Sequence, residues 1–333
     1  MSVIHQEGST ITSQTTNPDS VFTVRVPAST SNLGAGFDSI GMALGRWLEL
    51  TVRVTGGDAP VTIRRAGTLA TLDCVDSDDL IWRGFVAACV ALRRTAPGGI
   101  EIDASSEIPI ARGLGSSAAA IIAGVLLANA LFDGDLDNAA VIDIAAALDG
   151  HPDNVAPSVL GGAVLSIRTT GHHYHSARLA VHRSLRFAFL VPDFEIRTAN
   201  ARAALPAQLD YGTAVTAAAR AAALVVGLQS GDAATLRPAL DDLLHVPFRR
   251  SLVPGYDRVT EAAINAGAIG ATLSGSGSTI VAVAHAGTEA AICDAAISAW
   301  RTVGVNAESF VTKPEAYGAT IDTVGKTYGT LQF

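Results

Sequence analysis

The chain has 333 residues, of which 49% are hydrophobic and 16% are charged, and its formal net charge is −8. This composition predicts a globular protein of about two domains with a sizeable core, and it excludes a disordered chain. The acidic balance argues against nucleic acid or an anionic membrane as the main partner. The only lysines are Lys313 and Lys326, so a buried cationic site must be built from arginine, whose planar fork suits carboxylate and phosphate.

Cysteine usage and the N-terminus indicate where the protein works. The three cysteines lie far apart with no C-x-x-C and read as small buried residues in a reducing compartment: Cys74, Cys89 and Cys293. No basic region leads into an apolar core at the N-terminus, so no signal peptide is predicted. The longest apolar stretch, around Ala118–Phe132, is too short to span a membrane. We therefore expect a cytoplasmic protein whose residues 1–20 form a disordered tail.

The first predicted elements are strands around a polar loop. Strands are expected at Val21–Pro27, Leu48–Val54 and Ile100–Ala104, with Val61–Arg65 as the partner of Leu48–Val54. Between the first two, A-S-T-S-N-L-G-A-G-F-D at Ala28–Asp38 has too few apolar residues for a helix and predicts a loop. Its Asn32 and Asp38 either hold polar groups of a ligand or only bond their own backbone. A helix capped by Ser77–Asp79 is expected to run to about Arg94.

A Gly-rich turn then leads into an apolar helix. The segment Pro109–Ala120 reads P-I-A-R-G-L-G-S-S-A-A-A, and the run Ile121–Leu127 follows it. Such a turn presents unpaired N–H groups and the positive end of the helix dipole, which together favour a phosphate. Ser116 and Ser117 add hydroxyls that suit a phosphate oxygen or Mg²⁺. The pattern is neither a Walker A loop nor G-x-G-x-x-G, and the alternative is a helix start whose glycines serve packing alone.

The segment H-P-D-N-V-A-P-S-V-L-G-G at His151–Gly162 is the second candidate. Pro152 suits the first turn of a helix, where Asp153 and Asn154 would offer negative charge and ligand oxygens. His151 is either structural or part of a site. A histidine cluster after it predicts a solvated loop tip more readily than a metal site: His172, His173 and His175.

A composition shift near Thr169–Arg183 predicts a domain boundary, which divides the chain into residues 21–170 and 171–333. Beyond it, strands and helices alternate again, so the architecture is α/β or α+β. The predicted strands are Leu185–Val191, Ile269–Leu273, Thr279–Ala284 and Ala307–Val311, and the predicted helices are Arg197–Leu205, Thr213–Leu228, Asp257–Ala266 and Thr288–Thr302. Thr198 and Arg202 lie one turn apart on one face of the first of these helices.

Three segments together resemble the GHMP small-molecule kinases. They are P-A-S-T-S-N-L-G-A-G-F-D at 27–38, P-x-x-x-G-L-G-S-S-A at 109–118 and S-G-S-G-S at 274–278. Further markers are similar to the homoserine kinase subfamily: H-P-D-N-V-A-P at 151–157, R-x-x-L-P at 202–206 and R-x-x-L-x-P-G at 249–255. The resemblance implies an α+β fold of two domains, an N-terminal ATP-binding domain of the ribosomal-S5 type and a ferredoxin-like C-terminal domain that completes the substrate site.

The resemblance also implies roles for individual residues. The phosphate loop would wrap the triphosphate of ATP: Pro109, Ile110, Ala111, Arg112, Gly113, Leu114, Gly115, Ser116, Ser117, Ala118 and Ala119. Mg²⁺ would be held by Ser117 and by Asp143, with Asp149 as the rival carboxylate. The catalytic set would be Asn154, Ser117, Asp143 and Thr198. L-Homoserine would be bound by Asn32, Asp38, His151, Arg202 and Arg249, with the arginines on its carboxylate and Asp38 on its ammonium.

Asn154 stands where related kinases have an Asp that accepts the hydroxyl proton, so the expected reaction is direct transfer without a carboxylate base. The alternatives are a GHMP kinase for threonine, mevalonate or shikimate, or a non-catalytic nucleotide-binding relative. The sequence does not give the oligomeric state, and a homodimer is left open.

Overall fold

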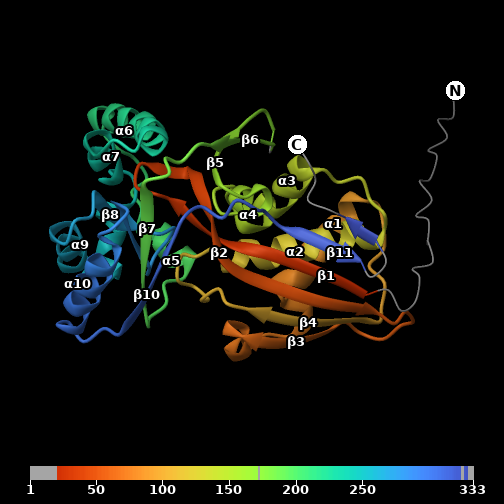
Figure 1. The fold of residues 1–333 in the computed structure, drawn as a ribbon. Helices are drawn as coiled ribbons and strands as arrows, with labels where there is room; N and C mark the ends of the chain where they lie inside the picture. The colour runs from red at the N-terminus through yellow and green to blue at the C-terminus, as the bar shows by residue number, and fades with distance from the viewer. Residues whose placement is uncertain (1–20, 172, 324–325, 329–333) are drawn as a thin grey trace, which may run out of the picture.

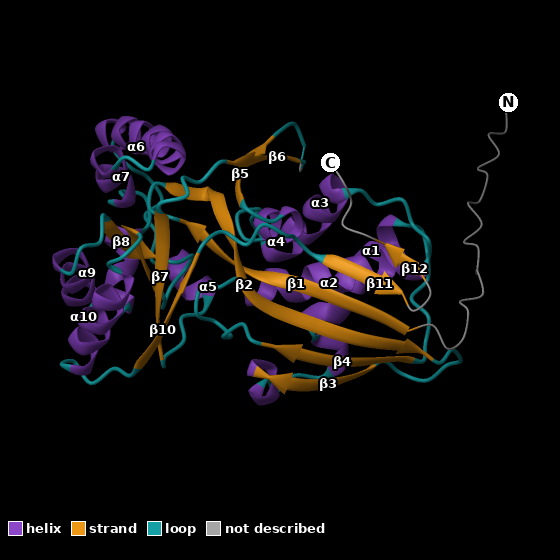
Figure 2. Cartoon of the chain, viewed as in Figure 1, coloured by secondary structure: helices purple, strands orange, loops and turns teal. Residues whose placement is uncertain are grey.

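The computed structural model describes residues 21–171, 173–323 and 326–328, and these form two β-sheets flanked by helices (Figures 1 and 2). The predicted disordered tail at residues 1–20 lies outside the described residues, as does His172. Strands and helices are mixed in both halves of the chain, which confirms the α+β prediction.

The first sheet has the strand order β12-β11-β1-β2-β4-β3, and β5 pairs with both β2 and β6. Its strands are β1 (Val21–Asn32), β2 (Gly36–Val54), β3 (Thr62–Gly67), β4 (Ile100–Ser106), β5 (Ala163–Arg168), β6 (Tyr174–Leu179), β11 (Thr320–Thr323) and β12 (Lys326–Tyr328). Four helices accompany it: α1 (Leu80–Ala91), α2 (Ser116–Leu131), α3 (Asn138–Asp149) and α4 (Val155–Leu160). Two short 3-10 helices, η1 (Thr68–Thr71) and η2 (Asp76–Asp78), lie between β3 and α1.

Helix α2 is the buried centre of this half, and small residues allow its close packing. It lies against β1 and along α1 (Figure 2). A Cβ on Gly84 of α1 would stand 2.2 Å from the carbonyl oxygen of Ile121, and one on Gly124 of α2 would stand 1.9 Å from that of Ile81. The two backbones therefore touch at these glycines, which lets α2 pack closely along α1.

The second sheet is antiparallel, with the order β10-β7-β9-β8. Its strands are β7 (Leu185–Pro192), β8 (Gly270–Leu273), β9 (Ile280–His285) and β10 (Ala307–Thr312). The helices of this half are α5 (Thr198–Ala203), α6 (Tyr211–Ser230), α7 (Ala233–Leu240), α8 (Val246–Arg249), α9 (Tyr256–Asn265) and α10 (Glu289–Arg301), with the 3-10 helix η3 (Arg250–Leu252) after α8. Helices α9 and α10 pack on one side of this sheet, and α6 packs on α7 (Figure 1).

Two local predictions are wrong. The segment Ala28–Asp38 is not a loop, because its small residues continue β1 and pair with β2, so that only a short turn separates the two strands. The strand predicted at Val61–Arg65 pairs with β4 in parallel, not with the strand that precedes it. Alternation of apolar residues identified the strand but gave no information about its neighbour.

The sheets also differ from the predicted division at residue 170. Strand β6 pairs with β5 in the first sheet, and β11 pairs with β1 after the chain has left the second sheet. The first unit therefore takes residues up to Leu179 and the end of the described chain, whereas β7 to β10 form the second sheet.

Helix α6 is long and apolar enough, by length and composition, to cross a membrane, which corrects the expectation that no such stretch exists. It is rich in alanine and packs on α7 with Leu224 and Leu228 buried. Single helices of ordinary globular proteins pass the same test.

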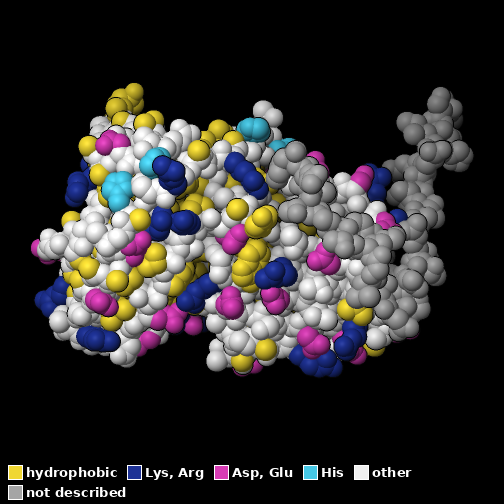
Figure 3. Space-filling model, in the orientation of Figure 1, with side chains coloured by type: hydrophobic (Ala, Val, Ile, Leu, Met, Phe, Trp, Pro, Cys, Tyr) yellow, Lys and Arg dark blue, Asp and Glu magenta, His cyan; other side chains and the backbone are white. Residues whose placement is uncertain are grey.

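On the face drawn in Figure 3, basic and acidic side chains are interspersed.

Candidate active site

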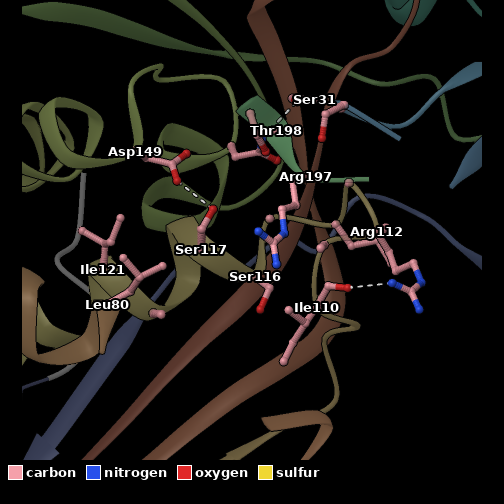
Figure 4. A pocket seen from close by; sticks show the side chains of 18 of the residues that line it. Ser31, Leu80, Ile110, Arg112, Ser116, Ser117, Ile121, Asp149, Arg197 and Thr198 are labelled. Atoms are coloured by element: carbon pink, nitrogen blue, oxygen red, sulfur yellow. Dashed lines mark hydrogen bonds between the residues drawn. The ribbon is translucent and has the colours of Figure 1, made fainter. Parts of the chain in front are cut away.

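A cavity of about 510 Å³ lies where the two sheets meet the start of α2. One end is apolar and includes Leu69, Leu72, Leu80, Ile121 and Leu148. The middle is the phosphate loop, and the other end carries the polar side chains Asp38, His151, Arg202 and Arg249. Figure 4 shows the loop side of the cavity, with Ile110, Ser116 and Ser117 around it.

The phosphate loop adopts a conformation that requires glycine. Gly113 and Gly115 both have φ near +71°, in the left-handed region. A Cβ on Gly113 would stand 2.1 Å from the carbonyl oxygen of Ser274, and one on Gly115 would stand 2.3 Å from Ser29 Oγ. The two glycines therefore allow the loop to bend sharply and to pack closely against Ser274 and Ser29. Helix α2 begins at Ser116, so its first N–H groups and its dipole point into the cavity.

The Ser-Gly-rich turn at 274–278 joins the loop to β1. Ser274 Oγ donates to the carbonyl oxygen of Gly113 at 2.6 Å, and Gly275 N donates to that of Ser31 at 3.1 Å. Asn32 Nδ2 donates to the carbonyl oxygen of Gly275 at 3.0 Å, while its Oδ1 accepts from Asp38 N. Asn32, expected to bind substrate, is thus a link between the two halves that sits on the cavity wall.

Not every residue of the predicted loop faces the cavity with its side chain. Arg112 directs its guanidinium to the carbonyl oxygens of Pro192, Asp193 and Ile110, so only its backbone is available to a triphosphate (Figure 4). Ala118 and Ala119 are fully buried, and they are not among the residues that line the cavity, nor is Pro109. Of the predicted phosphate-loop residues, only residues 110–117 line the cavity.

The hydroxyl of Ser117 pairs with Asp149, which corrects the assignment of Asp143. Ser117 Oγ donates to Asp149 Oδ1 at 2.7 Å, and both residues line the cavity (Figure 4). Asp143, half a helix earlier on α3, instead accepts from Tyr174 N and lies 2.6 Å from His173 Nδ1. Helical periodicity turns Asp143 toward β6 and brings Asp149, the last residue of α3, to the cavity.

A buried charged cluster stands next to this pair. His151 Nδ1 lies 2.9 Å from Asp153 Oδ1 and 3.6 Å from Asp149 Oδ2. Burial opposes the charging of His151, but the hydrogen bond to Asp153 and the charges of both carboxylates outweigh it and raise its pKa to about 9. Burial also raises the pKa of Asp149. Asp149 Oδ2 is buried without a hydrogen-bond partner among the described residues.

Asn154 is held by serines of β1. Its Oδ1 accepts from Ser29 Oγ at 3.1 Å and its Nδ2 donates to Ser31 Oγ at 3.0 Å. The side chain is therefore fixed in one orientation on the cavity wall, and its acceptor is already engaged. An amide in this setting can donate a hydrogen bond but cannot remove a proton.

The two arginines lie together at the polar end, as the family resemblance implies, but in different states. Arg202 makes a bidentate pair with Asp38, at 2.7 and 2.6 Å, and this hydrogen bonding raises the pKa of Arg202. Arg249 is 2% exposed, donates from Nε to the carbonyl oxygen of Ala201, and pairs with no carboxylate among the described residues. Burial and the nearby Arg202 lower the pKa of Arg249 to about 10. A buried cation with no carboxylate in direct contact attracts an anion.

An aromatic contact that the sequence did not reveal supports both arginines. The guanidinium carbons of Arg202 and Arg249 each lie 5.3 Å from the centroid of the Phe37 ring. Phe37 stacks on the fully buried His245, with centroids 4.9 Å apart. Burial lowers the pKa of His245 to about 4, so its ring is neutral near neutral pH. Phe37 and the neutral His245 ring therefore pack beside the two arginines without adding a negative charge of their own.

The remaining predicted residue, Thr198, begins α5 and lines the cavity near Ser31 (Figure 4). The sequence singled out Asp153 as a source of negative charge but gave it no role, and it passed over Phe37, His245 and Arg197, all of which contact or line the site. The F-D pair at 37–38 was the one available signal for Phe37, because it stands next to a predicted ligand residue.

The fold, the Gly-rich loop that opens α2 and the cavity between two halves are those of the GHMP kinases. The family models described as "GHMP kinases N terminal domain" and "GHMP kinases C terminal" match residues 79–162 and 224–302.

Comparison with individual proteins narrows the class. Over 308 residues the chain is 37% identical to a homoserine kinase of Trichormus variabilis, covering 90% of this chain and 98% of the relative. It is 41% identical over 266 residues to a homoserine kinase of Deinococcus radiodurans, covering 80% and 85% of the two chains. The crystal structure of a homoserine kinase from Cytophaga hutchinsonii superimposes with a TM-score of 0.80 at 28% identity, covering 93% of this chain and all of the other. The chain belongs to the homoserine kinase family.

Proposed function

We propose that the protein transfers the γ-phosphoryl group of ATP to the side-chain hydroxyl of L-homoserine, giving O-phospho-L-homoserine and ADP for threonine biosynthesis. The observation that carries this proposal is one cavity that joins a phosphate loop to a pair of arginines. Membership of the homoserine kinase family supports the choice of substrate.

The shape of the cavity favours one orientation of ATP. The apolar end, with Leu69, Leu72 and Leu80, suits the adenine base. The main-chain N–H groups of residues 113–117 and the dipole of α2 then meet the phosphates. The γ-phosphoryl group would be presented toward Arg202 and Arg249, where the acceptor binds.

The residues at the loop fit a Mg²⁺ ion. Mg²⁺ takes few protein ligands and completes its shell with phosphates and water, so one hydroxyl and one carboxylate suffice. Ser117 Oγ and Asp149 Oδ1 supply that pair, and Asp149 Oδ2, which lies 3.6 Å from His151 Nδ1 but makes no hydrogen bond, offers a further oxygen. No cluster of three or more candidate metal-ligating side chains occurs in the described chain, which agrees with an ion that depends on ATP for its remaining ligands. When bound, Mg²⁺ would neutralise phosphate charge.

Homoserine has groups that match the polar end of the cavity. Its carboxylate suits Arg249, which pairs directly with no described carboxylate, together with Arg202. Its ammonium suits Asp38, and Asn32 and His151 would complete the polar contacts. Because Asp38 and Arg202 pair with each other in the structure, binding exchanges one ion pair for two contacts with a zwitterion.

The chemistry needs positioning more than proton abstraction. The substrate oxygen forms a bond to Pγ, the bond from Pγ to the bridging oxygen breaks, and its electron pair leaves with ADP. Asn154 orients the hydroxyl as a donor, and the hydroxyl proton passes to the transferred phosphoryl group or to solvent. A loose transition state makes little demand on nucleophile activation, so positioning and charge stabilisation carry the reaction.

The decisive experiment is a panel of alcohols with purified protein, ATP and Mg²⁺. ADP release that depends on homoserine supports the proposal. Release with mevalonate, shikimate or threonine and none with homoserine identifies another kinase of the superfamily. ATP binding without turnover on any alcohol identifies a non-catalytic nucleotide-binding protein. The homodimer and the cytoplasmic location stay predictions, and so does the absence of nucleic-acid and membrane partners.

A further inference from the structure

Arg197 is a charged side chain of the cavity that the proposed contacts leave unused. It immediately precedes α5, whose first residue is Thr198, and it lines the same cavity as Ser116 and Ser117. In Figure 4 its guanidinium group points into the cavity, away from Thr198 and toward Ser116 and Ser117. Its side chain makes no hydrogen bond or ion pair with any residue that the structure describes.

The other arginines that line the cavity already bind other groups of the protein. Arg112 binds three carbonyl oxygens and also lies 3.4 Å from Glu195 Oε1. Arg202 is paired with Asp38, and Arg249 is anchored to Ala201 and turned to the acceptor end. The loop itself contains no lysine. The other cation of the cavity, His151, lies 2.9 Å from Asp153, so Arg197 is the cation left for a phosphate among the described residues that line the cavity.

A structural role does not account for this placement. A cation at the N-terminus of a helix meets the positive end of the helix dipole, so Arg197 does not stabilise α5. The nearest acidic residue in the chain, Glu195, pairs with Arg112 instead. An exposed arginine would ordinarily turn to solvent, yet this one faces a cavity already lined by N–H groups and hydroxyls.

We propose that Arg197 is a catalytic residue that binds the γ-phosphoryl oxygens and the β–γ bridging oxygen as phosphate is transferred. The inference rests on the proposed kinase function. As the acceptor oxygen bonds to Pγ and the bond to the bridging oxygen breaks, negative charge moves onto that oxygen of ADP. A planar guanidinium can donate to a γ-phosphoryl oxygen and to the bridging oxygen at once. Because the bridging oxygen gains charge only during transfer, the guanidinium stabilises the transition state more than it stabilises bound ATP. The proton of the acceptor follows the path given above, and Arg197 stays charged throughout.

The test compares Arg197→Met, which keeps the length and removes the charge, with Arg197→Lys and with Arg183→Met. Arg183 is an exposed arginine that lines a different groove, so its variant controls for loss of one positive charge. Steady-state kinetics with homoserine and ATP–Mg²⁺ give kcat and both KM values, and thermal unfolding checks the fold. We expect Arg197→Met to lower kcat on the order of 10²-fold with little change in either KM, because the lost contact acts mainly in the transition state.

Arg197→Lys should recover part of kcat, and added guanidinium ion should partly restore an Arg197→Ala variant in a saturable way. An Arg197→Met enzyme with kcat equal to that of Arg183→Met overturns the proposal, as does a rise in the KM for ATP with no change in kcat. Failure of the kinase function itself is distinguishable, since wild-type protein would then release no ADP with homoserine.

Discussion

The hydroxyl of Ser117 and the carboxylate of Asp149 lie 2.7 Å apart, although Ser117 lies in the first turn of α2 and Asp149 ends α3. The pairing brings a carboxylate to the phosphate loop, which itself supplies only backbone N–H groups and hydroxyls. It also holds the ends of two packed helices together at the floor of the cavity. A site for a divalent cation at this point depends on the relative position of α2 and α3.

Asp149→Asn should therefore abolish most turnover, whereas Asp143→Asn should not. The amide keeps the size of the side chain but loses the charge that attracts Mg²⁺, so we expect kcat to fall by about 10²-fold or more and the Mg²⁺ requirement to rise. Asp143 contacts Tyr174 and His173 outside the cavity, so its variant is a matched control. Equal loss of activity in the two variants would contradict the assignment of Asp149.

Loss of Arg249 should weaken homoserine binding without weakening the fold much. In Arg249→Met we expect the KM for homoserine to rise about 10²-fold, because a desolvated charge pair with the carboxylate is lost. The free energy of unfolding should fall by no more than about 1 kcal/mol, since the lost hydrogen bond to Ala201 is offset by relief of a buried unpaired charge.

In the structure the guanidinium of Arg202 pairs with Asp38. Arg202→Ala should also raise the KM for homoserine, by about 10²-fold. The KM for ATP is the internal control for both arginines, because neither is expected to contact the nucleotide base. A variant in which the KM for homoserine is unchanged would place that arginine outside the acceptor site.

Buried His245 should make the fold sensitive to acid. Its folded pKa is about 4, below the ordinary value of 6.5, so the unfolded chain binds the proton more readily. Its contribution to stability is present above pH 6.5 and is lost as the pH falls toward 4. From about pH 7 to about pH 5 the wild type should lose roughly 2 kcal/mol more than His245→Asn, measured by denaturant unfolding. Identical pH profiles would show that His245 is not buried as a neutral ring.

The site was predictable wherever the chain carries a local pattern. The conformational preferences of Gly113 to Ser117 predict a phosphate-binding turn at the N-terminus of a helix, and the structure places that turn at the start of α2. Arg202 and Arg249 lie far apart in the sequence, and resemblance to a family, not spacing, associated them. Their meeting depends on the packing of α5 and α8 around Phe37.

The predictions that were wrong concern contacts between segments that lie far apart in the sequence. Periodicity identified β3 but not its parallel partner β4, since one strand pattern fits any neighbour. Asp143 and Asp149 both lie on α3, and only the packing of that helix decides which carboxylate reaches Ser117. The buried neutral state of His245 likewise follows from its surroundings in the fold.

Gly113→Ala tests how the phosphate loop is held against the second half of the chain. Gly113 has φ +71° and its added Cβ would stand 2.1 Å from the carbonyl oxygen of Ser274, so alanine meets both strain and a backbone clash. Gly162→Ala is the matched control, because Gly162 has φ +73° and no atom within 4 Å of the same position. We expect Gly162→Ala to lower the free energy of unfolding by about 1 kcal/mol through strain alone, and Gly113→Ala by at least about 2 kcal/mol more. Denaturant unfolding measures both, and ATP binding should weaken only in Gly113→Ala, because only there must the loop move away from Ser274. Equal destabilisation of the two variants would show that the loop can separate from the turn at 274–278 without cost.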